Sequence, residues 1–316
     1  MSGHLGSAAI LGLALRLAGL CCILGVSSEC NGAAAEPKVA HWLMLDLPPG
    51  SIPINGHPTD GISDVALELI MGEMPEYTHK ITVVNAARAM VFLAEGEPAC
   101  FATAAYTPER SQIAYFSLTN VLPPLQIVIR ADGVKKLPLN ERGEVIAKAL
   151  FERSDLHGVV IAQRSYSPTL DELLRHRGQH SGVVNVLAAD SGANVLRMVM
   201  HGRADYTLEY EFIINYQARR YKELGGGKNL VTLPIAGAEP VLIGVACPHT
   251  AWGRDMIRRV DGILAKVSVS PRYRESVNRW LSAGGVQHHM ILQDEFFAER
   301  ADPAPASSYP EWPRVK

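Results

Sequence analysis

Strand-like and helix-like segments alternate along this chain, and that alternation constrains the fold more than any other feature of the sequence. In the first half, the hydrophobic pattern predicts strands over residues 39–45 and 81–84 and helices over residues 65–71 and 86–94. Such alternation is typical of an α/β domain with a largely parallel sheet. Because ligands of α/β sheets bind beyond the carboxyl ends of the strands, we expect a ligand site there.

The second half of the chain repeats this pattern. Strands are predicted over residues 159–162, 183–188, 205–209 and 241–246, and helices over residues 165–174, 194–201, 252–267 and 271–282. With 316 residues, of which 47% are hydrophobic, the chain is long enough for about two domains with full cores. The tail 301–316 is rich in Pro, Ala and Ser and is expected to be disordered.

Charge excludes one class of partner. The net charge is −2 and no block of Lys and Arg occurs, so the electrostatic footprint of a nucleic-acid-binding protein is missing. We therefore expect no nucleic-acid partner.

The N-terminus has the layout of a cleavable export signal. Arg16 precedes ten apolar or small residues, 17–26, and a polar stretch then ends in three alanines at Ala35. A run of ten is far shorter than the roughly 18 residues that a membrane-spanning helix needs. We expect a signal peptide over residues 1–35 and a mature protein outside the cytoplasm.

Two of the five cysteines, Cys100 and Cys247, remain after this cleavage. In an oxidising compartment an even pair is a disulfide candidate, whereas two buried thiols are the alternative, and spacing alone leaves both open. Neither cysteine lies in a Cys-x-x-Cys motif, and His288 and His289 lack partners at metal-ligand spacing. We expect no metal site. The glycine run 225–227 breaks the phosphate-loop pattern and predicts a hinge-side turn.

The segment Thr107-Pro108-Glu109-Arg110 is the strongest candidate for a ligand contact. It follows an expected strand over residues 99–105, and its proline and threonine are typical of a helix start. Backbone N–H groups and the Arg110 guanidinium could bind one carboxylate together. The alternative is a surface turn with a solvated arginine.

Taken in order, several motifs resemble the periplasmic solute-binding proteins of family 3, the polar amino-acid receptors of ABC importers. The resemblance covers about residues 38–285 and is nearest to an uncharacterised exported subgroup. It rests on Asp46-Leu47-Pro48-Pro49, Leu93-Ala94-Glu95-Gly96, the Thr107–Arg110 segment followed by Phe116-Ser117, Leu156-His157-Gly158-Val159-Val160, and Gly202-Arg203-Ala204-Asp205.

This resemblance implies a type II periplasmic-binding-protein fold, with two α/β lobes, a ligand cleft and two hinge crossings. Lobe one would comprise residues 38–120 and 242–300, and lobe two residues 125–237. It also implies that the strand near Cys100 pairs antiparallel with the strand that ends near Cys247, so that the two sulfurs form a disulfide in lobe one.

The resemblance further implies a set of ligand contacts. Arg110 matches the carboxylate-binding arginine of the family, and Thr107 and the backbone at Ala105 lie beside the same carboxylate. In lobe two, Ser165 resembles the start of the anion-binding loop, and Arg164 adds positive charge there.

Other positions depart from the family pattern or leave two roles open. The acid that accepts the ligand's amino group is replaced by Tyr210, with Glu209 one position earlier. Tyr106 either replaces the stacking aromatic residue or belongs to the core. Arg88 is either a second anion contact or an exposed helical arginine, and Asp46 is a possible acceptor for a ligand amine.

The implied function is capture of a small anionic or zwitterionic, amino-acid-like solute by lobe closure, for delivery to an ABC permease. The alternatives are a sensory or interaction protein that signals through a membrane sensor, and a dehydratase-like enzyme with Glu209 or Glu211 as general acid. We expect a monomeric protein without a cofactor that is not an enzyme.

Overall fold

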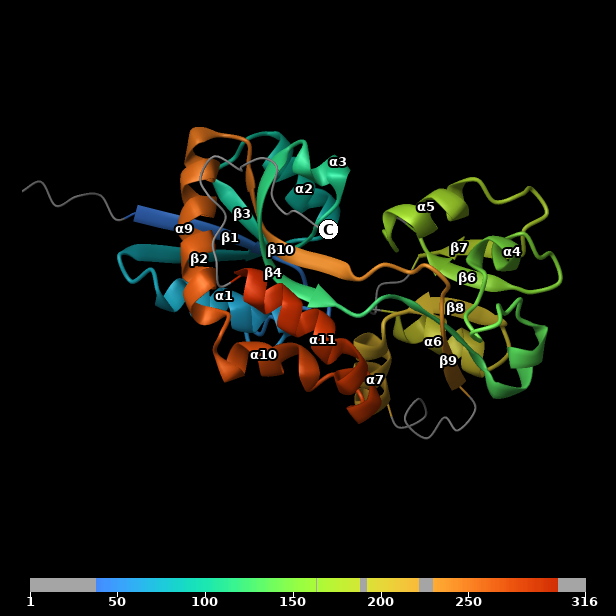
Figure 1. The fold of residues 1–316 in the computed structure, drawn as a ribbon. Coiled ribbons are helices and arrows are strands. Elements are labelled where there is room, and N and C mark those ends of the chain that lie inside the picture. Colours follow the sequence, from blue (N-terminus) through green and yellow to red (C-terminus); the bar gives the residue numbers. More distant parts are fainter. Residues whose placement is uncertain (1–37, 163, 188–191, 222–229, 301–316) are drawn as a thin grey trace, which may run out of the picture. The chain divides into compact units, whose positions relative to one another are not determined.

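The computed structural model describes residues 38–162, 164–187, 192–221 and 230–300. The expected signal peptide, the glycine run at 225–227 and the tail 301–316 lie outside the described residues. The described strands form two five-stranded sheets, each flanked by helices (Figure 1). We call these units lobe one and lobe two, and the expected two-lobed α/β architecture is confirmed.

The sheet of lobe one has the strand order β2-β1-β3-β10-β4. Its strands are β1 (Lys38–Met44), β2 (Tyr77–Val83), β3 (Ala99–Ala105), β4 (Ala114–Leu122) and β10 (Val241–Pro248). β1 pairs in parallel with β2 and β3, whereas β10 runs antiparallel to β3 and β4. β2, β1, β3 and β4 therefore share one direction and only β10 opposes them, so the sheet is largely parallel as expected, with one antiparallel strand from late in the chain between β3 and β4.

The sheet of lobe two has the strand order β7-β6-β8-β5-β9 and repeats this arrangement. Its strands are β5 (Gln126–Arg130), β6 (Gly158–Ile161), β7 (Val183–Val186), β8 (Tyr206–Glu209) and β9 (Leu230–Pro234). β6 pairs in parallel with β7 and β8, and β5 runs antiparallel to β8 and β9. Because β6 and β8 are parallel neighbours, their carboxyl ends meet at one edge of the sheet.

Helices pack against both sheets. Those of lobe one are α1 (Ile62–Gly72), α2 (Ala86–Ala94), α3 (Pro108–Ser111), α9 (Ala251–Val267), α10 (Pro271–Asn278) and α11 (Ala283–Arg300). Those of lobe two are the 3-10 helix η1 (Ala131–Lys136), α4 (Ala147–Phe151), α5 (Pro168–Arg175), α6 (Ala193–Met200) and α7 (Glu211–Arg220). The chain passes between the sheets twice, once between β4 and β5 and once between β9 and β10 (Figure 1).

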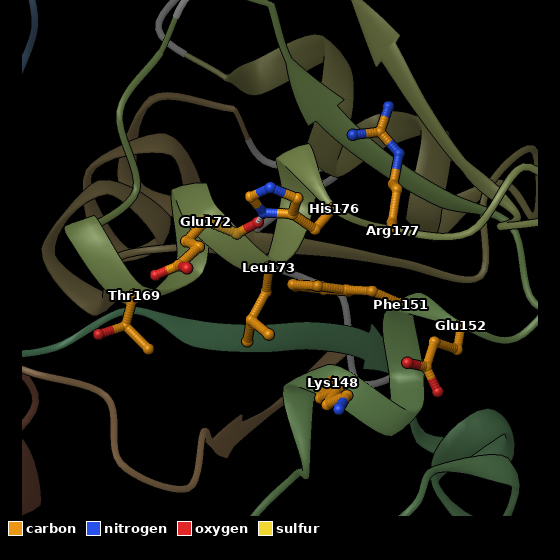
Figure 2. A pocket seen from close by; sticks show the side chains of 8 residues that line it. All are labelled: Lys148, Phe151, Glu152, Thr169, Glu172, Leu173, His176 and Arg177. Carbon is orange, nitrogen blue, oxygen red and sulfur yellow. Dashed lines mark hydrogen bonds between the residues drawn. The ribbon is translucent and has the colours of Figure 1, made fainter.

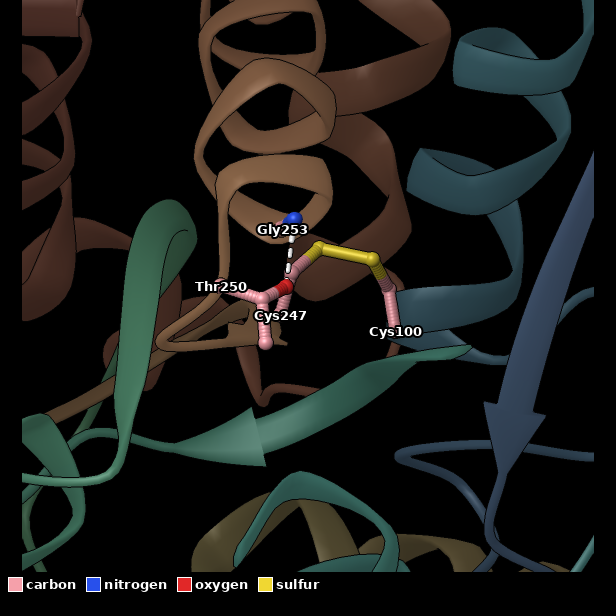
Figure 3. The surroundings of a disulfide bond; sticks show 4 residues. All are labelled: Cys100, Cys247, Thr250 and Gly253. Atoms are coloured by element: carbon pink, nitrogen blue, oxygen red, sulfur yellow. Dashed lines mark hydrogen bonds between the residues drawn. A yellow bond between two sulfur atoms is a disulfide. The ribbon is translucent and has the colours of Figure 1, made fainter. Parts of the chain in front are cut away.

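A disulfide between Cys100 and Cys247 joins β3 to β10 in the core of lobe one (Figure 3). Their Cα atoms lie 4.4 Å apart, and both side chains are buried. The bond follows from the antiparallel pairing of the two strands, which places Ala246 opposite Phe101. The expected bridge is confirmed, and Cys247 lies within β10, which extends beyond the predicted strand end at residue 246.

Helix α1 begins earlier than its apolar pattern predicted because a buried acid organises its start. The Asp64 carboxylate accepts hydrogen bonds from the backbone N–H groups of Ile52, at 2.8 Å, and Gly61, at 3.2 Å. It also accepts one from the Ser51 hydroxyl at 2.8 Å. Asp64 therefore fixes both the first turn of α1 and the preceding loop.

The end of the chain also differs from expectation. Helix α10 ends at Asn278, four residues before the predicted end, and α11 follows it. Among the described residues, no helix is both long and apolar enough to cross a membrane.

Candidate functional site

The Thr107 turn forms as the sequence predicted. The Thr107 hydroxyl caps α3 by accepting the backbone N–H of Arg110 at 3.2 Å, and Pro108 occupies the first turn. Nη1 of Arg110 donates to the carbonyl oxygen of Ala105 at 2.8 Å. This contact fixes the guanidinium at the carboxyl end of β3.

Arg110 is partly withdrawn from solvent. Burial lowers the pKa of its guanidinium, and the negative charges of Asp171 and Glu109 oppose that shift. Its pKa lies so far above neutrality that Arg110 remains charged. The residue thus provides a positioned cation with donors left over after the bond to Ala105.

Tyr106 packs into lobe one. It is half-buried, and its ring meets that of Phe116 edge-on with 5.3 Å between the centroids. Its backbone N–H donates to the carbonyl oxygen of Leu242 at 2.8 Å. These contacts favour the core role among the two that the sequence left open.

Arg88 and Asp46 are both exposed. The guanidinium carbon of Arg88 lies 4.8 Å from the ring centroid of Phe92, one turn along α2, and its backbone N–H donates to the capping Asn85 side chain at 2.8 Å. Asp46 follows the end of β1. The arrangement of Arg88 fits the alternative of an exposed helical arginine.

In lobe two, the structure brings together two residues that the sequence analysis treated as separate ligand contacts. Arg164 and Glu209 form a bidentate ion pair, with Nη1–Oε2 at 2.8 Å and Nη2–Oε1 at 2.6 Å. Burial alone would lower the pKa of Arg164, yet the charge and hydrogen bonds of Glu209 raise it above its usual value. Arg164 therefore carries its charge in this pair at physiological pH.

Two tyrosines that the sequence analysis did not connect with Arg164 flank the ion pair. The guanidinium carbon lies 5.1 Å from the ring centroid of Tyr166 and 5.5 Å from that of Tyr210. Both rings are buried, and desolvation raises the pKa of both hydroxyls. Tyr166 is a near neighbour of Arg164 in the sequence, whereas Tyr210 reaches it only through the pairing of β6 with β8, so that contact leaves no local signal.

Ser165 binds a neighbour in its own lobe. Its hydroxyl donates to Asp171 Oδ2 at 2.6 Å, and the backbone N–H of Tyr166 donates to Oδ1 of the same carboxylate at 2.8 Å. Ser167, and not Ser165, caps α5 by accepting the N–H of Leu170 at 3.2 Å. The loop before α5 is therefore organised by an acid that the sequence analysis did not single out.

A shallow groove of about 370 Å³ lies elsewhere on lobe two, between α4 and α5 (Figure 2). Phe151 and Leu173 supply apolar surface, and Lys148, Glu152, Glu172 and Arg177 are among the charged residues that line it. No residue of the candidate site lines this groove. Within the described part of the chain, no group of three His, Cys, Asp or Glu side chains could hold a metal ion.

No family model matches the sequence, and no curated protein matches it either. Solved structures do match. A chain from the study of glutathione import via GshT and the cystine ABC importer TcyBC of Streptococcus mutans has a TM-score of 0.61 and 14% identity, covering 77% of this chain and 95% of that one.

Two further solved structures match to a similar degree. A histidine kinase sensor domain with similarity to periplasmic binding proteins gives a TM-score of 0.58 and 18% identity, covering 78% of this chain and 97% of that chain. A double mutant of the VFT2 domain of BvgS from Bordetella pertussis gives a TM-score of 0.56 and 22% identity, covering 78% of this chain and 95% of that chain. The chain has the type II periplasmic-binding-protein fold. Its structural neighbours are solute-binding proteins of the family 3 type and related sensor domains.

Within the type II periplasmic-binding-protein fold, the candidate residues occupy strand ends of both sheets. Arg110 lies just beyond β3 in lobe one, and Arg164 and Glu209 lie at the ends of β6 and β8 in lobe two. These are the strand ends at which the alternating pattern predicted a ligand site. Their roles in binding stay predictions.

Proposed function

We propose that this protein is a periplasmic receptor that binds a small carboxylate-bearing solute and delivers it to an ABC permease. The observation that carries the proposal is the arginine positioned at the carboxyl end of β3, on a fold shared with ABC importer receptors. A guanidinium held by a backbone carbonyl keeps its other N–H groups available, and these suit bidentate binding of a carboxylate.

The disulfide supports the expected location. A buried Cys100–Cys247 bridge is typical of proteins that fold in an oxidising compartment, which agrees with an export signal over residues 1–35. N-terminal sequencing of the mature protein tests the cleavage site after Ala35. Release of the protein by osmotic shock tests the location.

A sensory role is the second candidate. It is favoured by the match to a histidine kinase sensor domain and to the BvgS VFT2 domain, which cover as much of this chain as the importer receptor does. Both candidates require ligand capture and differ in the partner. Cross-linking in cells separates them, because a permease partner supports import and a membrane kinase partner supports sensing.

An enzymatic role is not part of the proposal. The two acids considered as general acids are both engaged in contacts within the protein. Glu209 is paired with Arg164, and Glu211 accepts the backbone N–H of Ser282 at 2.9 Å.

We further propose a monomer, which light scattering of the purified protein checks.

The proposed ligand capture is tested by native mass spectrometry of protein released from the periplasm. A retained small molecule is expected on the wild type and on Arg142→Gln, since Arg142 is exposed and outside the site. It is expected to be absent from Arg110→Gln. Retention of the same molecule by Arg110→Gln would contradict the role of Arg110.

A further inference from the structure

The carboxylate of Glu209 is already occupied inside lobe two. Oε2 accepts Nη1 of Arg164, and Oε1 accepts both Nη2 of Arg164 and the backbone N–H of Tyr210, the latter at 2.8 Å. On the Oε2 side Gly192 lies so close that a Cβ there would be 2.8 Å from the oxygen. Only 3% of the Glu209 side chain is exposed.

Because Glu209 is paired with Arg164, lobe two offers a ligand a cation and not a free carboxylate. The ion pair is neutral as a whole, and its more exposed member is the cation, because 19% of the Arg164 side chain is accessible. A buried ammonium group needs an anionic or hydrogen-bonding partner to offset its lost hydration. Arg164 repels such a group, whereas it attracts a carboxylate.

The pair is also held in place. The Arg164 guanidinium lies within 5.5 Å of the ring centroids of both Tyr166 and Tyr210, and the Tyr166 hydroxyl accepts the backbone N–H of Ile161 at 2.6 Å. Tyr210 in turn stacks on Phe212, with 5.0 Å between ring centroids. A guanidinium fixed by two rings and a bidentate carboxylate has little freedom to release Glu209 to a ligand.

The second acid of this region is likewise engaged. Both oxygens of Asp171 accept hydrogen bonds, from the Ser165 hydroxyl and from the Tyr166 N–H. Asp46, the amine acceptor expected in lobe one, is exposed, so water competes for any ammonium group it would bind.

We propose that the Arg164–Glu209 pair makes this site selective for carboxylates without an ammonium group, so that it prefers deaminated acids over the corresponding α-amino acids. This inference rests on the proposed solute-binding function and specifies its ligand class. Lobe two would contribute a fixed cation where an ammonium-binding acid would otherwise act.

Matched pairs of compounds test the selectivity. Calorimetric titration of the exported protein compares glutarate with glutamate, succinate with aspartate, and 3-phenylpropanoate with phenylalanine. For any pair that binds, we expect the deaminated member to bind at least about tenfold more tightly. Equal or tighter binding of the α-amino acid overturns the inference and leaves the proposed function intact. Failure of all six compounds and of a broad solute panel overturns both.

A variant of the pair identifies the source of the selectivity. Arg164→Gln/Glu209→Gln removes both charges while keeping hydrogen-bonding groups, and circular dichroism and thermal melting establish that it folds. We expect its preference for the deaminated acid to fall toward equality. If the folded double variant keeps the wild-type ratio, the pair is not the selective element. If it does not fold, Tyr210→Leu, which removes one flanking ring, is expected to reduce the same ratio, and an unchanged ratio there overturns the assignment.

Discussion

Arg164 and Glu209 lie 45 residues apart in the sequence, and their side chains form a bidentate ion pair at the adjoining ends of two parallel strands. β6 and β8 are neighbours in the sheet of lobe two, so the residue that ends β8 meets the loop that follows β6. The pairing is thus a consequence of sheet topology.

Removing either partner of this pair is expected to destabilise the protein. Arg164→Met leaves the Glu209 carboxylate without its cation, and Glu209→Gln leaves the Arg164 guanidinium without its anion. Each single change should lower the unfolding free energy by about 3 to 5 kcal/mol. Combining the two should cost less than their sum, with a coupling of about 0.5 to 3 kcal/mol. Urea denaturation of the four proteins measures this coupling. Strict additivity would show that the two side chains do not interact.

The disulfide is expected to stabilise lobe one substantially. Cys100 and Cys247 close a loop of 147 residues, for which the chain-entropy model gives about 5 kcal/mol, and measured bridges in secreted domains contribute about 2 to 5 kcal/mol. In denaturant titrations, the unfolding free energy of Cys100→Ala/Cys247→Ala should be lower than that of the oxidised wild type by about 2 to 5 kcal/mol. Added reductant should then have no further effect on the variant. A double variant as stable as the oxidised wild type would contradict this prediction.

Two glycines of α9 should respond to alanine in opposite ways. Gly253 packs on the end of β10, and its backbone N–H donates to the Thr250 hydroxyl (Figure 3). A Cβ atom at position 253 would lie 2.0 Å from the carbonyl oxygen of Pro248. Gly253→Ala should therefore destabilise by about 1 to 3 kcal/mol. Gly262 has open space at the same position, so Gly262→Ala should stabilise by about 0.5 to 1 kcal/mol through helix propensity. Thermal melts that rank the two variants the other way would refute the close approach.

Acid is expected to weaken the β1–β2 edge of lobe one. Burial, and then the charge of Lys80 on the neighbouring strand, lower the pKa of His41 below its usual value of 6.5. As pH falls below that value the unfolded chain binds a proton that the folded state resists, so unfolding free energy decreases until the folded pKa is reached. At pH values well above 6.5, His41 is neutral in both the folded and the unfolded state, and the effect on the unfolding free energy vanishes.

Replacing Lys80 isolates this effect. Lys80→Gln removes the repulsion and leaves His41 equally buried, so its melting temperature should fall less than that of the wild type between about pH 7.5 and pH 5.5. Lys148→Gln, on the exposed surface of lobe two, serves as the matched control. An identical fall in all three proteins would contradict the prediction.

Much of the fold was predictable because it depends on local signals. The helix predicted over 86–94 has those bounds in the structure, and the Thr107 cap and its proline located α3. Helix α11 was missed because its burial pattern runs against residue type. Met290 and Ile291 are 51% and 68% exposed, whereas His289 is buried with Nε2 at 3.0 Å from the carbonyl oxygen of Val121.

The candidate site was predictable only residue by residue. The sequence identified Arg110 through the Thr107–Arg110 segment, and Arg164 and Glu209 only through the family resemblance. It could not show that Arg164 and Glu209 bind one another, because that contact depends on which strands are neighbours in the sheet. The disulfide required the family resemblance for the same reason.

The most direct test of the central claim is a thermal-shift comparison of mature wild type and Arg110→Gln against amino acids, small carboxylates and cyclic acids. A true ligand at 100 times its dissociation constant should add about 2.7 kcal/mol of stability to the wild type. We predict that at least one carboxylate does so and that Arg110→Gln shows no shift. A flat profile for the wild type, or an equal shift in Arg110→Gln, would contradict a solute receptor anchored by Arg110.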